Sequence, residues 1–184
     1  MEKKSLWVFG TREVVYAAIG AALYGVFSWV TNFLALPAAG NISLRPAVAI
    51  PMFFGIAFGP IVGFLAGFVG NLLGDFLSGW GFWWAWCLGN GIMGMIPGFI
   101  GLLGGIVSFK DKGTLIKAEV LVVIAALVGM LVPSLLEIPL SGIDFNTAIV
   151  GYWLPAALSN IINGLILVPI LMVAYDAVVA RSGR

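Results

Sequence analysis

Long runs of apolar residues, separated by short polar or glycine–proline breaks, dominate this chain. These runs predict six helical segments, at about 14–36, 46–58, 60–77, 84–107, 118–136 and 147–173. The second run is short and contains Pro51, and the pair Gly59-Pro60 separates it from the third. A helix needs about 20 apolar residues to cross a bilayer. We therefore expect an all-α integral membrane protein, folded as one compact bundle of six transmembrane helices over residues 1–184.

The composition supports the membrane interpretation. Hydrophobic residues make up 61% of the 184 residues and charged residues only 9%, whereas soluble domains carry about 25% charged residues. The net charge of +1 gives no indication of a nucleic-acid partner.

The basic residues predict how the bundle is oriented. They gather before the first segment, between the fourth and fifth, and after the sixth: Lys3, Lys4, Arg12, Lys110, Lys112, Lys117, Arg181 and Arg184. With six spans, all three groups fall on one side, which the positive-inside rule makes cytoplasmic. Both termini are then cytoplasmic, and the loops 37–45, 78–84 and 137–147 face outward.

Polar residues inside apolar segments are the first candidates for a binding site, because they are costly in a membrane. Asn71 and Asp75 are one helical turn apart, and Asn90 shares a helical face with Trp83 and Trp86. These side chains either bridge neighbouring helices or contact a ligand in a mostly apolar pocket.

The sixth segment and two outer loops add further candidates. Asn160 follows Trp153 by seven residues, and Asn163 lies one turn further in. Arg45 lies on the outer side, where it either snorkels to lipid headgroups, pairs with Asp75 or Glu137, or contacts a ligand. Glu137 itself lies at the outer end of the fifth segment.

The stretch GWGFWWAWCLGN, residues 79–90, contains four of the seven tryptophans. An interfacial belt would spread such rings among helices. We interpret Trp83 and Trp86 as a stacking wall for a flat ligand and Trp80 as an interfacial anchor, and we expect Trp84 to point away.

Several classes of function lack their characteristic residues. The chain has no histidine and no GxxxxGK[ST] motif, so common metal sites, a Ser–His constellation and ATP binding through a P-loop are not expected. We predict no catalytic residues, no metal and no cofactor. A proton-coupled carrier, with Asp75 or Glu137 as the proton site, stays open.

Small residues recur at helical spacing in three segments. Glycines repeat every four residues in the third and fourth segments, which favours close helix packing. The first segment carries Ala17, Ala18, Ala21 and Ala22. That patch favours either packing inside the bundle or docking to another membrane protein.

Two runs, ISLRPAVAIPMFFGIAFGPIVGFLAGFVGNLLGD and GFWWAWCLGNGIMGMIPG, resemble the S components of energy-coupling factor (ECF) transporters, in the branch named after the riboflavin-type members. The resemblance extends over about residues 11–178. It implies a protein of a prokaryotic plasma membrane that captures a vitamin on the outer side and associates with a transmembrane coupling protein and two cytoplasmic ATPases. It also implies that an AxxxA pattern in the first segment contacts the coupling protein, which Ala17/Ala21 and Ala18/Ala22 both match.

The sequence thus predicts a substrate-capture component without enzymatic activity. A riboflavin-like ligand is the first expectation, and thiamine or its pyrimidine precursor the second. Two rivals are a stand-alone proton-coupled transporter and a membrane assembly subunit without a small ligand.

Overall fold

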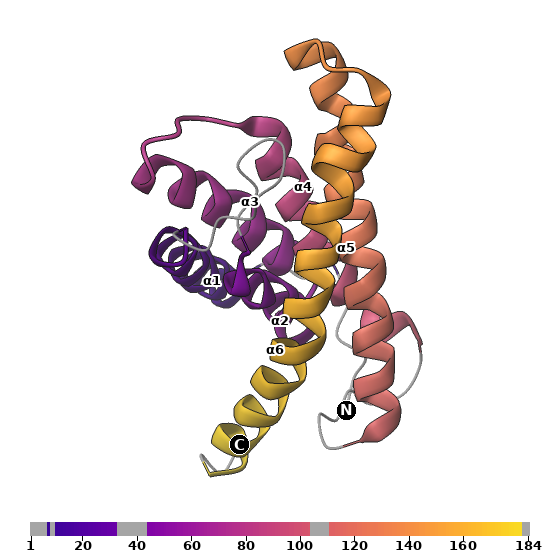
Figure 1. Cartoon of the computed structure of the whole chain (residues 1–184). Helices are drawn as coiled ribbons and strands as arrows, with labels where there is room; N and C mark the ends of the chain where they lie inside the picture. Colours follow the sequence, from indigo (N-terminus) through magenta and orange to yellow (C-terminus); the bar gives the residue numbers. More distant parts are fainter. Residues whose placement is uncertain (1–6, 8–9, 33–43, 104–110, 182–184) are drawn as a thin grey trace.

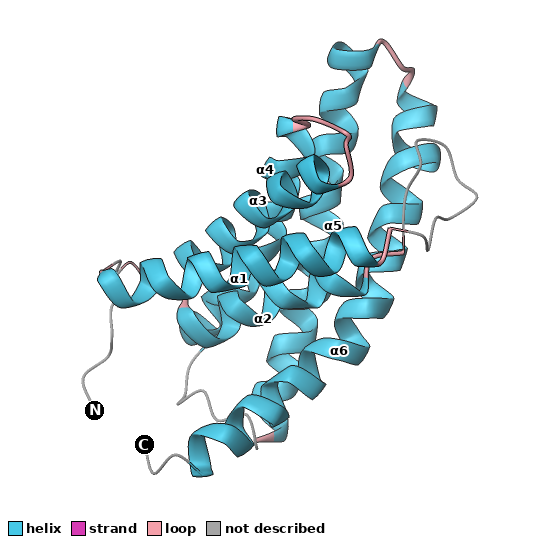
Figure 2. Cartoon of the chain, turned by 90° about the vertical axis from the view of Figure 1, so that its left-hand side faces the viewer, coloured by secondary structure: helices cyan, strands magenta, loops and turns pink. Residues whose placement is uncertain are grey.

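The computed structural model describes residue 7 and residues 10–32, 44–103 and 111–181. Within these ranges every regular element is a helix (Figure 2), which confirms the all-α prediction. The elements are α1 (Thr11–Val30), the 3-10 turn Pro46–Val48, α2 (Ala49–Phe58), α3 (Pro60–Leu77), α4 (Trp84–Met95), the 3-10 segment Ile96–Leu103, α5 (Lys112–Ser141), the π-helical segment Thr147–Trp153 and α6 (Leu154–Arg181).

Five helices are long and apolar enough to cross a membrane: Thr11–Val30, Pro60–Leu77, Trp84–Leu103, Lys112–Ser141 and Thr147–Arg181. The second segment has the predicted bounds, 46–58, and is short as predicted, with ten of its residues in α-helix. Gly59, at φ 108°, ends α2 in a backbone conformation that favours glycine, and Pro60 starts α3 at once. Of the six predicted transmembrane helices, five are therefore candidate spans by length, and the second, Pro46–Phe58, is an apolar helix too short to be counted among them.

Two of the helices extend beyond the spans predicted from the sequence. α5 runs over 112–141 rather than 118–136, and α6 continues to Arg181 rather than ending near 173. α5 begins early because the Asp111 side chain accepts a hydrogen bond from the Thr114 amide. This bond and a second one from the Thr114 hydroxyl lower the pKa of Asp111. The predicted ends near 36 and 107 lie outside the described residues.

Close contact between α3 and α4 determines the centre of the bundle. A Cβ atom added to Gly63 would collide with the main-chain oxygen of Gly94, and one added to Gly94 would collide with that of Gly63. One added to Gly67 would collide with the main-chain oxygen of Asn90. The two helices therefore pack backbone to backbone, as small residues at this interval allow in membranes.

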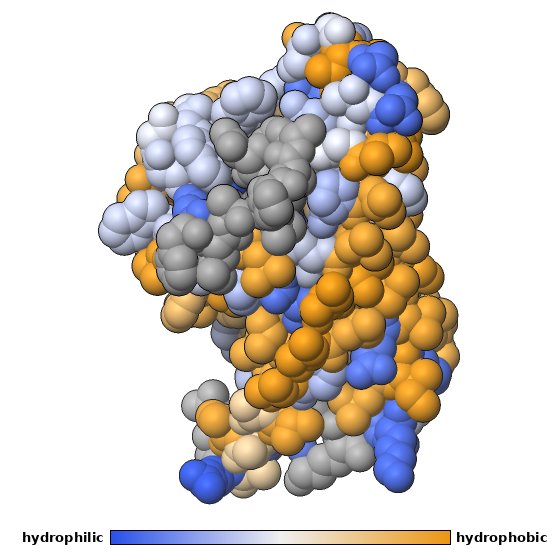
Figure 3. All heavy atoms as spheres, in the orientation of Figure 1, coloured by the Kyte–Doolittle hydropathy of each residue, from blue (hydrophilic) through white to orange (hydrophobic). Residues whose placement is uncertain are grey.

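The longest helices, α5 and α6, lie side by side, and α1, α2 and α3 cluster beside them (Figure 1). Hydrophobic side chains cover the middle of the face that α5 and α6 present, while hydrophilic side chains gather toward its two ends (Figure 3). This banding is the pattern expected of a bundle surrounded by lipid.

The α3–α4 contact predicts the effect of adding one methyl group. Gly67→Ala forces a methyl group against rigid backbone, so we expect a loss of about 1–3 kcal/mol of stability and a lower Tm in detergent. Gly74→Ala is the matched control on the same helix, because its nearest neighbour would be the Ser28 Cβ at 3.2 Å. Equal Tm values for the two variants would contradict backbone contact at Gly67.

Candidate binding site

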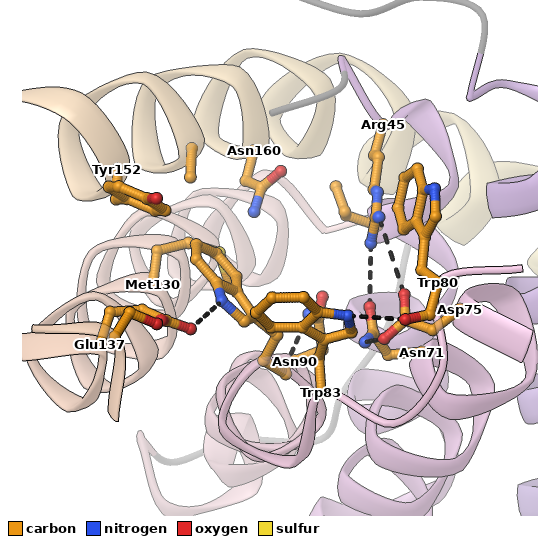
Figure 4. Close-up of a pocket in the computed structure, with 14 residues that line it drawn as sticks. Arg45, Asn71, Asp75, Trp80, Trp83, Asn90, Met130, Glu137, Tyr152 and Asn160 are labelled. Atoms are coloured by element: carbon orange, nitrogen blue, oxygen red, sulfur yellow. Dashed lines mark hydrogen bonds and ion pairs between the residues drawn. The ribbon is translucent and has the colours of Figure 1, made fainter. Parts of the chain in front are cut away.

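A cavity of about 380 Å³ lies between α3, α4, α5 and the start of α6 (Figure 4). It is lined by Arg45, Val48, Asn71, Asp75, Trp80, Trp83, Trp86, Asn90, Met130, Glu137, Ser141, Tyr152, Ala156 and Asn160. Its volume is within the range of about 300–1,000 Å³ that is usual for small-molecule sites. Eight of the ten residues that the sequence suggested for substrate contact line this one cavity.

One end of the cavity is formed by three polar side chains that contact one another. Arg45 donates from Nη1 to Asn71 Oδ1 at 2.9 Å, and Asn71 donates from Nδ2 to Asp75 Oδ2 at 2.8 Å. Arg45 Nη2 also lies 4.0 Å from Asp75 Oδ1. The structure thus shows the predicted pairing of Arg45 with Asp75, and Arg45 also lines the cavity.

A helix C-terminus places Trp80 above this cluster. The amide of Trp80 donates to the carbonyl of Asp75 at 2.9 Å, and the amide of Gly79 donates to that of Phe76 at 3.1 Å. These two bonds, with Gly79 at φ 74°, form a Schellman motif, whose left-handed residue is usually glycine. The Trp80 ring lies 5.5 Å from the Arg45 guanidinium carbon. Trp80 is therefore part of the cavity wall, where the sequence suggested only an interfacial anchor.

The first turns of α4 supply the rest of the aromatic wall. Trp83 donates from Nε1 to the main-chain carbonyl of Trp80 at 2.9 Å, which holds the Trp83 ring against the loop that carries Trp80. Trp83, Trp86 and Asn90 all line the cavity, whereas Trp84 does not. Helical spacing thus separated the inward rings of this cluster from the outward one.

The other end of the cavity is formed by Glu137 on α5, with Met130 and Tyr152 beside it (Figure 4). Glu137 is 3% exposed. Its Oε1 accepts a hydrogen bond from Trp86 Nε1 at 2.9 Å, and its Oε2 accepts one from the Ser141 hydroxyl. The two acidic residues of the cavity are thus at opposite ends.

The buried asparagine side chains differ in how many hydrogen bonds they form within the protein. Asn90 accepts from the Tyr24 hydroxyl at 2.6 Å and donates to the Trp86 carbonyl at 2.8 Å, so it joins α1 to α4. Asn160 lines the cavity and donates from Nδ2 only a weak hydrogen bond, 3.5 Å long, to the Met93 sulfur. Asn160 therefore keeps most of its hydrogen-bonding capacity for a ligand.

Trp153 and Asn163 lie outside the cavity. Trp153 donates to the Leu127 carbonyl at 2.9 Å, and Asn163 donates to the Ser159 carbonyl at 2.9 Å. The cavity-facing stripe of this region is instead Tyr152, Ala156 and Asn160, at four-residue spacing. The π-helical turn that ends at Trp153 is the local irregularity here, and such turns are frequent at functional sites.

Asp144 lies in the loop before this π-helical turn. Its carboxylate accepts hydrogen bonds from the Thr147 hydroxyl and the Thr147 amide, and these bonds lower the pKa of Asp144. Asp144 is exposed and does not line the cavity. Its role is to hold the start of the turn that carries Tyr152.

The alanine patch of α1 is divided between two faces. Ala17 and Ala21 are buried, at 5% and 3% exposure, whereas Ala18 and Ala22 are exposed. The first pair packs inside the chain, next to Gly20, whose added Cβ would meet Phe54 and Ala66. Only Ala18 and Ala22 are therefore available to a partner.

Residues 8–177 match the family model of the ECF-type riboflavin transporter, S component. No solved structure matches the chain.

Curated relatives are similar over part of their length. A UPF0397 protein of Vibrio atlanticus is 41% identical over 95 residues, 52% of this chain and 51% of that protein. One of Aliivibrio fischeri is 45% identical over 92 residues, 50% and 49% of the two chains. One of Photobacterium profundum is 46% identical over 88 residues, 48% and 47% of the two chains. The match thus spans about half the length of these relatives.

The family match covers almost the whole chain, includes every helix described above except the last four residues of α6, and agrees with the membrane character of the bundle. The chain therefore belongs to the family of S components of ECF-type riboflavin transporters.

Proposed function

We propose that this protein captures a small, flat, vitamin-like molecule from the outer side of a prokaryotic plasma membrane. The observation that carries this proposal is the cavity itself, in which Trp80, Trp83 and Trp86 lie beside a few fixed polar groups. Apolar and aromatic walls with sparse, well-placed polar groups are typical of small-molecule sites. Aromatic platforms favour flat rings.

The family is a transporter family whose members are embedded in the membrane, and it is not an enzyme family. The family is named after riboflavin, so a riboflavin-like ligand is our first candidate. Thiamine or its pyrimidine precursor is the second, because a tryptophan-lined cavity accepts other flat heterocycles equally well.

The positions of charges support the proposed orientation. Lys112 and Lys117 lie in the first turns of α5, while Glu137 and Ser141 of the cavity lie at its opposite end. The helix rises about 30 Å between Lys117 and Glu137, which is about the thickness of the hydrocarbon core. If the lysines are cytoplasmic, as the positive-inside rule favours, the cavity opens near the outer surface and both termini are inside.

Energy for import has to come from partners in this proposal. The sequence contains no P-loop, and of the two carboxylates considered as a proton site, Asp75 is already paired with Arg45 and Asn71. A transmembrane coupling protein and two cytoplasmic ATPases are the partners that the family membership supports. The exposed pair Ala18 and Ala22 is the surface of α1 that we propose for contact with the coupling protein.

The stacking wall predicts the effect of removing one ring. The ligand is first identified by mass spectrometry of the small molecules released from gently purified protein. Trp86→Ala should then weaken binding of this ligand about tenfold or more, because one stacked ring contributes about 1–3 kcal/mol. Titration of intrinsic fluorescence measures this loss. Trp84→Ala is the matched control, since Trp84 lies in the same cluster but outside the cavity. Equal affinities for the two variants would place the ligand elsewhere.

The docking surface predicts a separation of binding from transport. Ala18→Trp with Ala22→Trp puts two bulky rings on the outward face of α1, which blocks close helix approach. Ligand affinity should be unchanged, while co-purification with the coupling protein and uptake into cells should be lost. Leu158→Trp is the control on the exposed face of α6. Normal complex formation by the alanine variant would contradict docking through this face.

A further inference from the structure

Glu137 is a buried carboxylate for which the structure provides no positive charge. It lines the cavity at 3% exposure. Across the described stretches 10–32, 44–103 and 111–181, no lysine or arginine lies within ion-pair distance of it. Its two bonds come from neutral donors, the indole of Trp86 and the hydroxyl of Ser141.

At the opposite end of the cavity, the carboxylate does have a positive charge beside it. There the charge of Asp75 is opposed by Arg45 at 4.0 Å, and Asn71 joins the two side chains by hydrogen bonds. The lining residues of the cavity thus carry one positive group, Arg45, and two negative groups, Asp75 and Glu137. The uncompensated negative charge belongs to Glu137.

A buried charge without a partner is strongly unfavourable, and an opposite charge at hydrogen-bonding distance removes much of that penalty. A carboxylate has about four acceptor positions, and the bonds from Trp86 and Ser141 occupy two of those of Glu137. The π faces around this end also suit a cation. The ring centroids of Trp86 and Tyr152 lie 6.2 Å apart, and the two ring planes are inclined by 35°. Among the described residues, no side chain forms a hydrogen bond with the Tyr152 hydroxyl.

We infer that the cavity selects a flat ligand carrying a positively charged nitrogen group, such as a protonated amine, an amidinium or a cationic aminoheterocycle. The charged N–H groups donate to Glu137, and the adjoining ring lies against Trp86, whose own N–H holds the carboxylate in place. This inference rests on the proposed function and narrows it. Among the candidate ligands above, it favours those with a positive charge over a neutral flavin.

A matched pair of probes tests the inference directly. Benzamidinium and benzamide have nearly the same size and shape, but only benzamidinium is charged, and its two parallel N–H groups match a carboxylate. Binding to the purified full-length protein is measured by tryptophan fluorescence and calorimetry at millimolar probe concentrations. We expect benzamidinium to bind about tenfold or more tightly than benzamide.

The variant Glu137→Gln removes the charge but keeps an oxygen that accepts the Trp86 bond, so the fold should persist. It should abolish the preference for benzamidinium and leave benzamide binding unchanged. Glu119→Gln, on the same helix but outside the cavity, should keep the wild-type preference. A Tm close to that of the wild type shows that each variant is folded.

Three outcomes would overturn the inference: equal affinity for the two probes, binding of neither, or a preference that survives Glu137→Gln. These outcomes differ from failure of the proposed function. If the protein yields a neutral or anionic vitamin on purification and delivers it to its partners, capture stands and only the selection for positive charge fails.

Discussion

The backbone contact between α3 and α4 is the constraint on which the site depends. Gly63, Gly67 and Gly94 leave no room for a side chain where the two helices meet. This contact holds the polar face of α3, with Asn71, next to the start of α4, where Asn71 Nδ2 lies 3.5 Å from the sulfur of Cys87. Without it, the charged end of the cavity and the tryptophan wall would not face the same space.

From this contact the cavity extends between two fixed ends. At one end, the positive charge of Arg45 is paired with the negative charge of Asp75. At the other end, Glu137 accepts hydrogen bonds from neutral donors only, among the residues that the structure describes. Between them lie rings whose N–H groups are already used: Trp83 by a loop carbonyl and Trp86 by Glu137. A ligand therefore meets aromatic surfaces and polar groups that are already held in place, which reduces the entropy lost on binding.

Periodicity within regular helix was predictable from the sequence, and departures from regular helix were not. The α-helical repeat correctly grouped Trp83 with Trp86 and Asn90 and set Trp84 apart. It failed near Trp153, because a π-helical turn precedes α6 and Tyr152 takes the cavity position instead. It also missed Trp80, whose position follows from the Schellman motif at the end of α3. The glycine after Ser78 was the available signal for that motif.

The central claim is capture without independent transport, and reconstitution measures it most directly. The purified chain in liposomes should bind its ligand but not accumulate it, even under an imposed pH gradient, because in the proposed function the energy for import comes from the partner ATPases. Addition of the coupling protein and the two ATPases with ATP should produce concentrative uptake. Accumulation by the isolated chain, driven by the pH gradient alone, would contradict the account and favour a proton-coupled carrier.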